Sequence, residues 1–205
     1  MNNPRKTFSL PALFSGSLEV RLARSEQDLK AAQRLRYQVF FDELGAHKND
    51  QTTPGYDQDF FDPFCDHLLV IDQSQKQEDS VVGTYRLLRK QSAELAGRFY
   101  SAAEYDISPL LKFPGEILEL GRSCVKENYR SRSTMQLLWR GIAAYASLYG
   151  IDLLFGCASF PGTNLTLLKK PLSYLFHYHL APIEIRPKAL PEKWINMNIY
   201  TKESG

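Results

Sequence analysis

Long apolar runs are absent from this chain of 205 residues, and no stretch approaches the roughly 20 consecutive apolar residues that a membrane-spanning helix needs. An excess of charge of one sign is also absent. The 25 basic and 23 acidic residues give a formal net charge of +2, which offers no basis for a nucleic-acid partner. Cysteine is scarce, and the three present are too far apart for a disulfide framework or a CxxC metal site. We therefore expect a cytoplasmic protein with reduced thiols, in contact with a membrane at most peripherally.

The length of the chain suits one well-buried α/β domain and is too short for two domains of ordinary size. The start of the chain carries Arg5 and Lys6, but Pro11 interrupts its apolar residues, so it matches a signal peptide poorly. We expect three parts: a flexible leader at 1–17, the domain at 18–186 and a tail at 187–205.

Apolar spacings of two residues and of three to four residues alternate along the chain, which indicates strands and helices in turn. This order predicts a single α/β domain with a mixed central sheet flanked by helices. The expected elements are strands at 18–22, 67–72, 81–88, 116–125 and 151–158; a helix from the cap Ser25 to about 44; a loop or short helix around 101–111; a helix to 149 opened by a capping box of Ser133 and Gln136; and a helix at 163–178 that Pro171 bends or interrupts.

The segment between the strand that ends at Val125 and the next helix is a candidate anion site. Arg130 and Arg132 precede the helix, and the free backbone N–H groups near Ser133 and Thr134 would point at a ligand. Such a site suits a single phosphate group. The alternative is that the two arginines only solvate a loop between strand and helix.

Glu119 lies in an otherwise apolar strand, where an unpaired carboxylate is costly. It must therefore be paired, exposed on an open face, or less acidic than an ordinary glutamate, and a less acidic carboxylate serves well as a base. Arg122 is three residues away, which by strict alternation places it on the opposite face. A β-bulge at Gly121 would bring both side chains into one site. The alternative is an edge-strand glutamate that faces water or pairs with Arg122.

The segment 45–66 lacks periodicity and is both acidic and aromatic. Loops of this kind are more often functional than linkers, and its charge would favour a cationic amino acid. A polar surface loop anchored by its aromatic residues is the alternative. Its acidic members are Asp50, Asp57, Asp59, Asp62 and Asp66.

Arg36 on the first helix and Arg86 within a strand are cations in mostly apolar surroundings. Arginine binds a carboxylate in bidentate fashion, so either residue is a candidate for holding the carboxylate of an amino acid. We favour Arg86, because an arginine inside a strand needs a partner more urgently. Each arginine is equally a candidate for pairing with an aspartate of the acidic loop.

Two histidine patterns are set aside. His67 and Asp72 have an H-x4-D spacing that some acyltransferases use, but on a strand alternation sends them to opposite faces. His177 and His179 have no cysteine or carboxylate at matching spacing, so we expect no metal site.

Seven blocks of the sequence are long enough to be specific: RLRYQVFFDELGA, FDPFCDHLLVID, VVGTYRLL, LELGRSCV, LLWRGIAAYA, LLFGCASFPGT and LSYLFHYHLAP. Through them the chain closely resembles the L-ornithine N-acyltransferases, and the match covers about 18–186. The resemblance implies a GNAT-like fold and the transfer of a 3-hydroxyacyl group from acyl carrier protein to the α-amine of L-ornithine. The product is lyso-ornithine lipid, formed in the first step of ornithine lipid biosynthesis.

The same family is related to the acyl-homoserine lactone synthases, and this wider group implies roles for particular residues. Its E-x-x-R strand resembles Glu119 and Arg122, with Glu119 as the base, acting directly or through water. Three further features of the group imply the amino-acid site. Its strand arginine resembles Arg86, and its first-helix arginine resembles Arg36. Its acidic positions before the hairpin resemble Asp62 and Asp66.

The resemblance implies a carrier-borne donor and no permanently bound cofactor. The GNAT signature R-x-x-G-x-G is missing, because Arg130 is followed by SRSTM; this argues against tight binding of a CoA pyrophosphate and favours the phosphopantetheine of acyl carrier protein. The residues that would hold this arm are Val125, Arg130, Arg132, Ser133 and Thr134.

Alternative functions stay open at this point. The acceptor is ornithine, or else glycine, lysine or glutamine, and an acyl-homoserine lactone synthase is a further alternative. Family members usually continue beyond the LAP segment, so we also consider a truncated tail and a non-catalytic remnant that binds an acyl carrier. Lysines beside apolar residues in TLLKKPLSYLF suggest peripheral contact with the inner face of a membrane.

Overall fold

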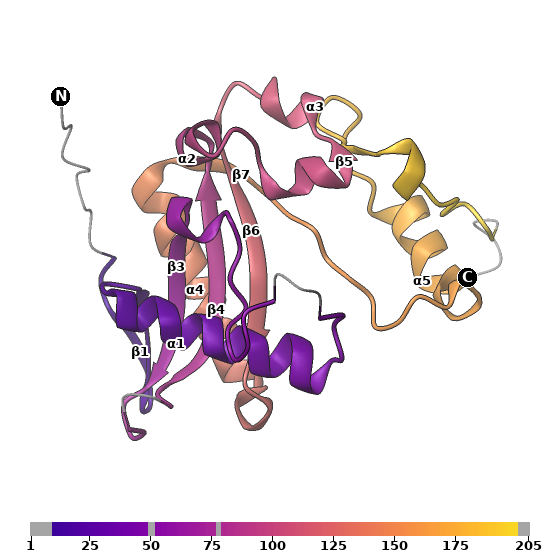
Figure 1. Ribbon diagram of the computed structural model, residues 1–205. Helices are drawn as coiled ribbons and strands as arrows, with labels where there is room; N and C mark the ends of the chain where they lie inside the picture. The colour runs from indigo at the N-terminus through magenta and orange to yellow at the C-terminus, as the bar shows by residue number, and fades with distance from the viewer. Residues whose placement is uncertain (1–9, 49–51, 77–78, 201–205) are drawn as a thin grey trace.

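A computed structural model describes residues 10–48, 52–76 and 79–200 (Figure 1). The first nine residues of the expected leader, Asp50 of the acidic loop and the last five residues of the expected tail lie outside the described residues. Within the described part, no helix is long and apolar enough to cross a membrane.

One mixed six-stranded sheet organises the molecule, in the order β1-β2-β3-β4-β6-β7. Neighbouring strands are antiparallel except β6 and β7, which are parallel. The strands are β1 (Leu13–Ser15), β2 (Leu18–Leu22), β3 (Asp66–Asp72), β4 (Val81–Arg89), β6 (Glu116–Val125) and β7 (Ile151–Phe155); β5 (Tyr105–Asp106) and β8 (Lys188–Ala189) pair separately. This confirms the predicted fold class. Because β1 lies within the expected leader and β8 within the expected tail, ordered structure extends past both expected boundaries of the domain.

Helix α1 (Glu26–Tyr37) crosses one face of the sheet, as Figure 1 shows. Ser25 caps it as predicted, because its hydroxyl accepts the N–H of Asp28 at 3.1 Å. The helix continues as a π-helix (Gln38–Glu43), and Gly45 follows with a φ of +68°, a conformation that glycine adopts without strain.

Helix α4 (Arg132–Tyr149) covers the opposite face. Its cap is Ser131, whose hydroxyl accepts the N–H of Thr134 at 3.3 Å, so the predicted capping box of Ser133 and Gln136 is wrong. The physical reason is that the preceding residues tighten into a 3-10 turn (Glu127–Tyr129), which shortens the loop and starts the helix earlier.

The core is divided by the sheet into two layers, because successive residues of a strand point to opposite faces. Leu68 and Val70 of β3 pack towards α4, and their neighbours Leu69 and Ile71 pack towards α1. A Cβ at Gly141 of α4 would lie 3.0 Å from the side chains of Leu68 and Val20, so the helix sits close to the sheet. Full burial of side chains of this size contributes about 1.5–3 kcal/mol each.

A third apolar cluster closes the end of the sheet near the carboxyl end of β4 and the start of β6. It is built from short helices, α2 (Lys90–Leu95), the 3-10 helix η3 (Tyr100–Ala103) and α3 (Ser108–Leu111), together with a further 3-10 turn η2 (Asp62–Phe64). Its buried members are Phe61, Leu88, Ala93, Ala96, Phe99, Ile107, Leu110 and Ile117.

The last helix, α5 (Leu165–Tyr178), begins at the cap Asn164 and stands apart from the sheet in Figure 1. It passes through Pro171 without ending, so of the bend or interruption expected there, the interruption does not occur. The preceding strand β7 ends at Phe155, three residues earlier than predicted.

Candidate active site

Strands β6 and β7 separate halfway along β6, and this divergence opens a cleft. The two strands pair from Glu116 with Ile151 to Glu119 with Phe155, after which only β6 continues. A Cβ at Gly156 would lie 2.1 Å from the carbonyl oxygen of Leu120, so glycine permits the close approach at the point of separation. The cleft has a volume of about 850 Å³, and β6, the segment after β7, α4 and the η3 region line it.

A β-bulge in β6 lies at the edge of this cleft. Gly121 pairs with Arg86 and Cys124 with Thr84, so two residues of β6 face one residue of β4. The bulge occurs at Arg122, which has a φ of +50°, and not at Gly121 as expected. It places Arg122 on the same face as Glu119, since its guanidinium contacts aspartates that lie on that face. The predicted meeting of these two residues at one site is therefore present, through a bulge one residue later.

Glu119 is buried, with 3% of its surface exposed, and it lies on an interior strand. Its Oε2 accepts the N–H of Tyr100 at 2.8 Å, and its Oε1 accepts the N–H of Ser101 at 2.7 Å and the Ser101 hydroxyl. The alternatives of an edge position or a pair with Arg122 are thus wrong. The thiol of Cys157 donates in turn to the Ser101 hydroxyl at 3.3 Å. Fixed donors hold the carboxylate in place at the wall of the cleft.

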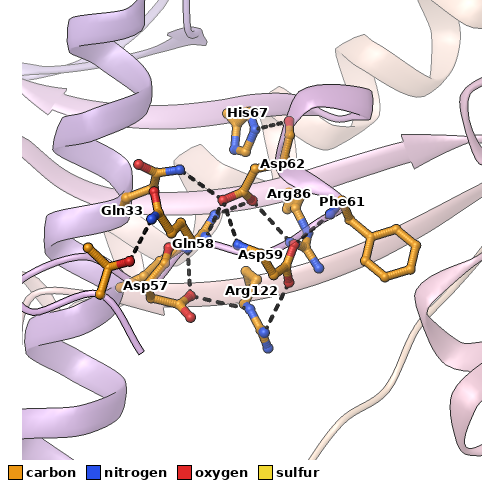
Figure 2. Close-up of polar contacts among 11 residues, drawn as sticks. Gln33, Asp57, Gln58, Asp59, Phe61, Asp62, His67, Arg86 and Arg122 are labelled. Carbon is orange, nitrogen blue, oxygen red and sulfur yellow. Dashed lines mark hydrogen bonds and ion pairs between the residues drawn. The ribbon is translucent and has the colours of Figure 1, made fainter. Parts of the chain in front are cut away.

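Arg36 and the acidic loop form the inner half of a buried ion-pair network. Figure 2 shows the loop aspartates of this network together with Arg86 and Arg122. Arg36 is fully buried and donates to Asp57 at 2.8 Å and to both oxygens of Asp62 at 3.0 and 2.8 Å. The amide of Gln33 donates to Asp62 at 2.9 Å. Burial alone would raise the pKa of Asp62, but the hydrogen bonds and charge of Arg36 hold that pKa well below its ordinary value.

Arg86 and Arg122 form the half of the network nearer the cleft. Arg86 donates to Asp59 at 2.6 Å and to Asp62 at 3.0 Å. Arg122 donates to Asp59 at 3.2 Å, and its Nε lies 3.2 Å from Asp57 without the geometry of a hydrogen bond. Arg122 remains about a quarter exposed and lines the cleft, so its guanidinium can donate hydrogen bonds to a further anionic group.

The predicted amino-acid site is only partly assembled in the cleft. Arg86 lines it, but Arg36 and Asp62 lie behind its wall within the network. Asp66 belongs to another cluster, where it accepts the hydroxyl of Tyr145 and lies 3.7 Å from Arg89. The acidic loop therefore neutralises arginines of this chain, and its predicted use as a site for a cationic ligand is not supported by the contacts.

The residues predicted to hold a phosphate lie around the start of α4, and one of them, Arg130, already has a partner. The guanidinium of Arg130 is already paired with Glu43 and also donates to the carbonyl of Val125 at 3.0 Å. Arg132 and Ser133 are exposed, whereas Thr134 is buried and takes part in the cap. The N–H groups of the first helical residues have no acceptor within the helix, as at any helix start.

Several residues of the cleft were missed from the sequence. Tyr100, Ser101 and Glu104 lie in a segment without periodicity, so no pattern placed them beside Glu119. Cys157 was assigned to a buried strand, yet it follows β7 and lines the cleft. A short polar segment before a strand that carries a buried carboxylate is a weak signal, and it is the signal that would have found Ser101.

Comparisons with known proteins identify a domain family, relatives and a similar solved structure. The acetyltransferase (GNAT) domain family matches residues 35–140. The L-ornithine N(alpha)-acyltransferase of Rhodobacter capsulatus is 44% identical over 196 residues, which cover 92% of this chain and 73% of that protein. The enzyme of the same name from Brucella abortus is 47% identical over 194 residues, covering 92% and 69%. Among solved structures, the AHL synthase LasI aligns with a TM-score of 0.49 and 20% identity, covering 68% of this chain and 71% of that one.

The sheet, the cleft and the family match define an acyltransferase of the GNAT class. Within that class, the identities to the two bacterial enzymes place the chain in the L-ornithine N(alpha)-acyltransferase family.

Proposed function

We propose that the chain transfers a 3-hydroxyacyl group from acyl carrier protein to the α-amine of L-ornithine and so forms lyso-ornithine lipid. The observation that carries the proposal is Glu119, a carboxylate held by three donors at the wall of the cleft, with Arg122 turned to the same face. Family membership supports ornithine as the acceptor.

The chemistry assigned to Glu119 is proton removal. Its Oε1 already accepts two donors, whereas Oε2 accepts one and keeps a lone pair for the proton of the amine, taken directly or through water. An α-amine loses a proton more easily than a side-chain ammonium near pH 7. The freed nitrogen attacks the thioester carbon and the C–N bond forms. The C–S bond then breaks, and the proton that the nitrogen loses as it becomes an amide goes to the sulfur, so the carrier leaves as its thiol.

Arg122 is the residue that we assign to the carboxylate of the acceptor. Arg86, which the sequence favoured, has a short contact with each of two aspartates, and only 4% of its side chain is exposed. Arg122 is the more exposed of the two and has the less complete set of hydrogen bonds. A planar guanidinium beside Glu119 orients an amino acid with its α-amine towards the base.

The divergence of the strands supports a pantetheine arm as the donor. Beyond Glu119, β6 has no strand partner on its β7 side within the described residues, so the amides of an extended arm can pair with it. The free N–H groups of Arg132 and Ser133, with the Arg132 side chain, suit the phosphate of the arm. Arg130 joins them on release from Glu43, which costs little because the pair is exposed.

Peripheral contact with a membrane is supported by one face of α5. Leu167, Tyr174 and Tyr178 are spaced at helical intervals, are at least half exposed and are flanked by Lys170. A face of this composition suits the surface of an anionic bilayer, where an acylated amino acid is delivered. Sedimentation of the protein with anionic and with neutral vesicles measures this contact, and equal recovery in both supernatants contradicts it.

The proposed activity is tested by incubating the purified chain with 3-hydroxyacyl-acyl carrier protein and isotopically labelled ornithine. We expect a labelled N-acyl ornithine by mass spectrometry, with fragmentation that places the acyl group on the α-amine. Glycine, lysine, glutamine and S-adenosylmethionine serve as competing acceptors, and acyl-CoA as a competing donor. Turnover of another acceptor in preference to ornithine contradicts the proposed substrate, and turnover of none contradicts the proposed activity.

A further inference from the structure

Three carboxylates line the cleft within the described part of the chain: Asp57, Glu104 and Glu119. Asp57 is paired with Arg36 and lies beside Arg122. Glu119 is occupied by the donors of Tyr100 and Ser101. Glu104, by contrast, has no side-chain hydrogen bond or ion pair to any described residue. Among the described residues it is therefore the one carboxylate of the cleft that keeps all of its acceptor sites for a ligand cation, whereas Glu119 keeps a single lone pair for the α-amine.

The backbone of Glu104 is fixed relative to Glu119. Its N–H donates to the carbonyl of Ser101 at 3.0 Å, and Ser101 is the residue that holds Oε1 of Glu119. On its other side, the carbonyl of Glu104 accepts the N–H of Leu190 at 2.9 Å. Glu104 thus follows the Glu119 contact by a single 3-10 turn, a rise of about 6 Å. This closeness of the two backbone segments allows one small molecule to reach both carboxylates.

The space near Cys157 lies under the influence of both carboxylates. Cys157 donates to Ser101, which in turn donates to Glu119. Burial is the main reason that the pKa of the Cys157 thiol is raised, and the charges of Glu104 and Glu119 add to the rise. The cations that line the cleft, Arg86 and Arg122, are engaged by aspartates of the acidic loop. This part of the cleft therefore favours a positively charged ligand.

We infer that Glu104 binds the side-chain ammonium of the acceptor and thereby selects a diamino acid for acylation. The inference rests on the proposed function and deepens it, because it assigns the second amine of the acceptor to a residue. With its carboxylate at Arg122 and its α-amine at Glu119, the acceptor directs its side chain along the cleft to Glu104. The acidic loop, which the sequence suggested for this role, is already neutralised.

The test compares Glu104→Gln with the wild type on two acceptors, L-ornithine and L-norvaline, which has a propyl side chain of the same carbon length without the ammonium. Loss of a charge-assisted contact raises the KM for ornithine by roughly ten- to a hundredfold. We expect kcat to change less than threefold, the KM for norvaline to stay the same, and the preference for ornithine over norvaline to collapse. Glu104→Asp restores part of the preference.

Glu94→Gln is the matched control, because Glu94 is exposed on α2 and does not line the cleft. It keeps the wild-type preference. If Glu104→Gln also keeps that preference, or lowers turnover of both acceptors alike, the inference is overturned while ornithine turnover by the wild type upholds the proposed function. If the wild type acylates no ornithine, the proposed function fails, and the inference fails with it.

Discussion

At the scale of single residues, the site depends on charges that are removed from water in balanced groups. Three arginines and three aspartates share the ion-pair network, part of which Figure 2 shows, and its member Arg36 is fully buried. Such a group tolerates loss of one member poorly, because the partners that remain are buried without compensation. The network also fixes the acidic loop in place, since Arg36 ties it to α1 and Arg86 and Arg122 tie it to the sheet.

Replacement of Arg36 by methionine tests this balance. We expect Arg36→Met to lower the free energy of unfolding by about 3–5 kcal/mol, because it leaves Asp57 and Asp62 without their main partner. Arg34→Met on the same helix removes a long contact to the Tyr56 hydroxyl at 3.5 Å and a cation–π contact with the same ring at 5.9 Å, so a change of about 1 kcal/mol or less is expected. Urea unfolding monitored by circular dichroism compares the two. Equal destabilisation would show that the network contributes nothing special.

His67 couples the same region to pH. Its Nε2 donates to the carbonyl of Asp62 at 3.1 Å, and its Nδ1 is buried without a partner. Burial holds the pKa of His67 below its ordinary value, so the folded state keeps the ring neutral while the unfolded chain binds a proton below about pH 6.5. The free energy of unfolding is therefore not reduced by His67 above that pH. Below it, protonation of the unfolded chain lowers the free energy of unfolding by at most about 1.4 kcal/mol per pH unit.

The measurement is the free energy of unfolding between pH 7.5 and 5. His67→Gln keeps an N–H donor and removes the titrating ring, so it should flatten this part of the curve. The depressed pKa of Asp62 acts at lower pH: its stabilisation is present above about pH 4 and is lost as the carboxyl is protonated. An unchanged slope between pH 6.5 and 5 in His67→Gln would contradict the assignment.

At the scale of elements, the cleft follows from how β6 and β7 part. Gly156 allows the chain to pass Leu120 closely before it turns away, and the bulge at Arg122 bends β6 at nearly the same level. These two irregularities lie on the two walls of the cleft. Both are local departures from a regular sheet, and both serve the position of side chains around Glu119.

Gly156→Ala should distort this junction. Its Cβ would lie 2.1 Å from a backbone oxygen, which cannot move as a flexible side chain would. We expect a loss of about 1–3 kcal/mol in unfolding free energy. Gly121→Ala is the matched comparison, since its Cβ meets only the Arg86 Nε at 4.0 Å, and it should be much better tolerated. Thermal unfolding of both variants decides the matter, and equal melting temperatures would contradict this account of the junction.

The sequence predicted regular elements better than irregular ones, for a physical reason. Strand 116–125 was predicted with its observed bounds and the end of α4 at 149 was predicted correctly, because their apolar spacing extends over many residues. The bulge was placed one residue early, since a positive φ at an arginine has no signal in composition. The turn η3 is four residues long, too short for a period to be seen, and it is the element that holds Glu119.

At the scale of the whole molecule, three layers meet at the cleft. The sheet supplies Glu119 and Arg122, the acidic loop under α1 supplies the aspartates, and the η3 segment supplies the donors that hold Glu119. The sequence predicted that Glu119, Arg122 and Arg86 belong to one site. It did not predict that the aspartates of the loop form ion pairs with arginines of the same chain. That outcome depends on contacts between residues more than 20 positions apart, which no local pattern records.

The most direct test of the account measures acyl transfer by Glu119→Gln. With 3-hydroxyacyl-acyl carrier protein and ornithine, we expect kcat to fall by about 10²–10⁴-fold, the range typical of a lost general base, with KM values near those of the wild type. Because Glu119 also anchors η3, the melting temperature is measured alongside, and the comparison is made well below it. A folded Glu119→Gln variant that turns over at the wild-type rate would contradict the central claim.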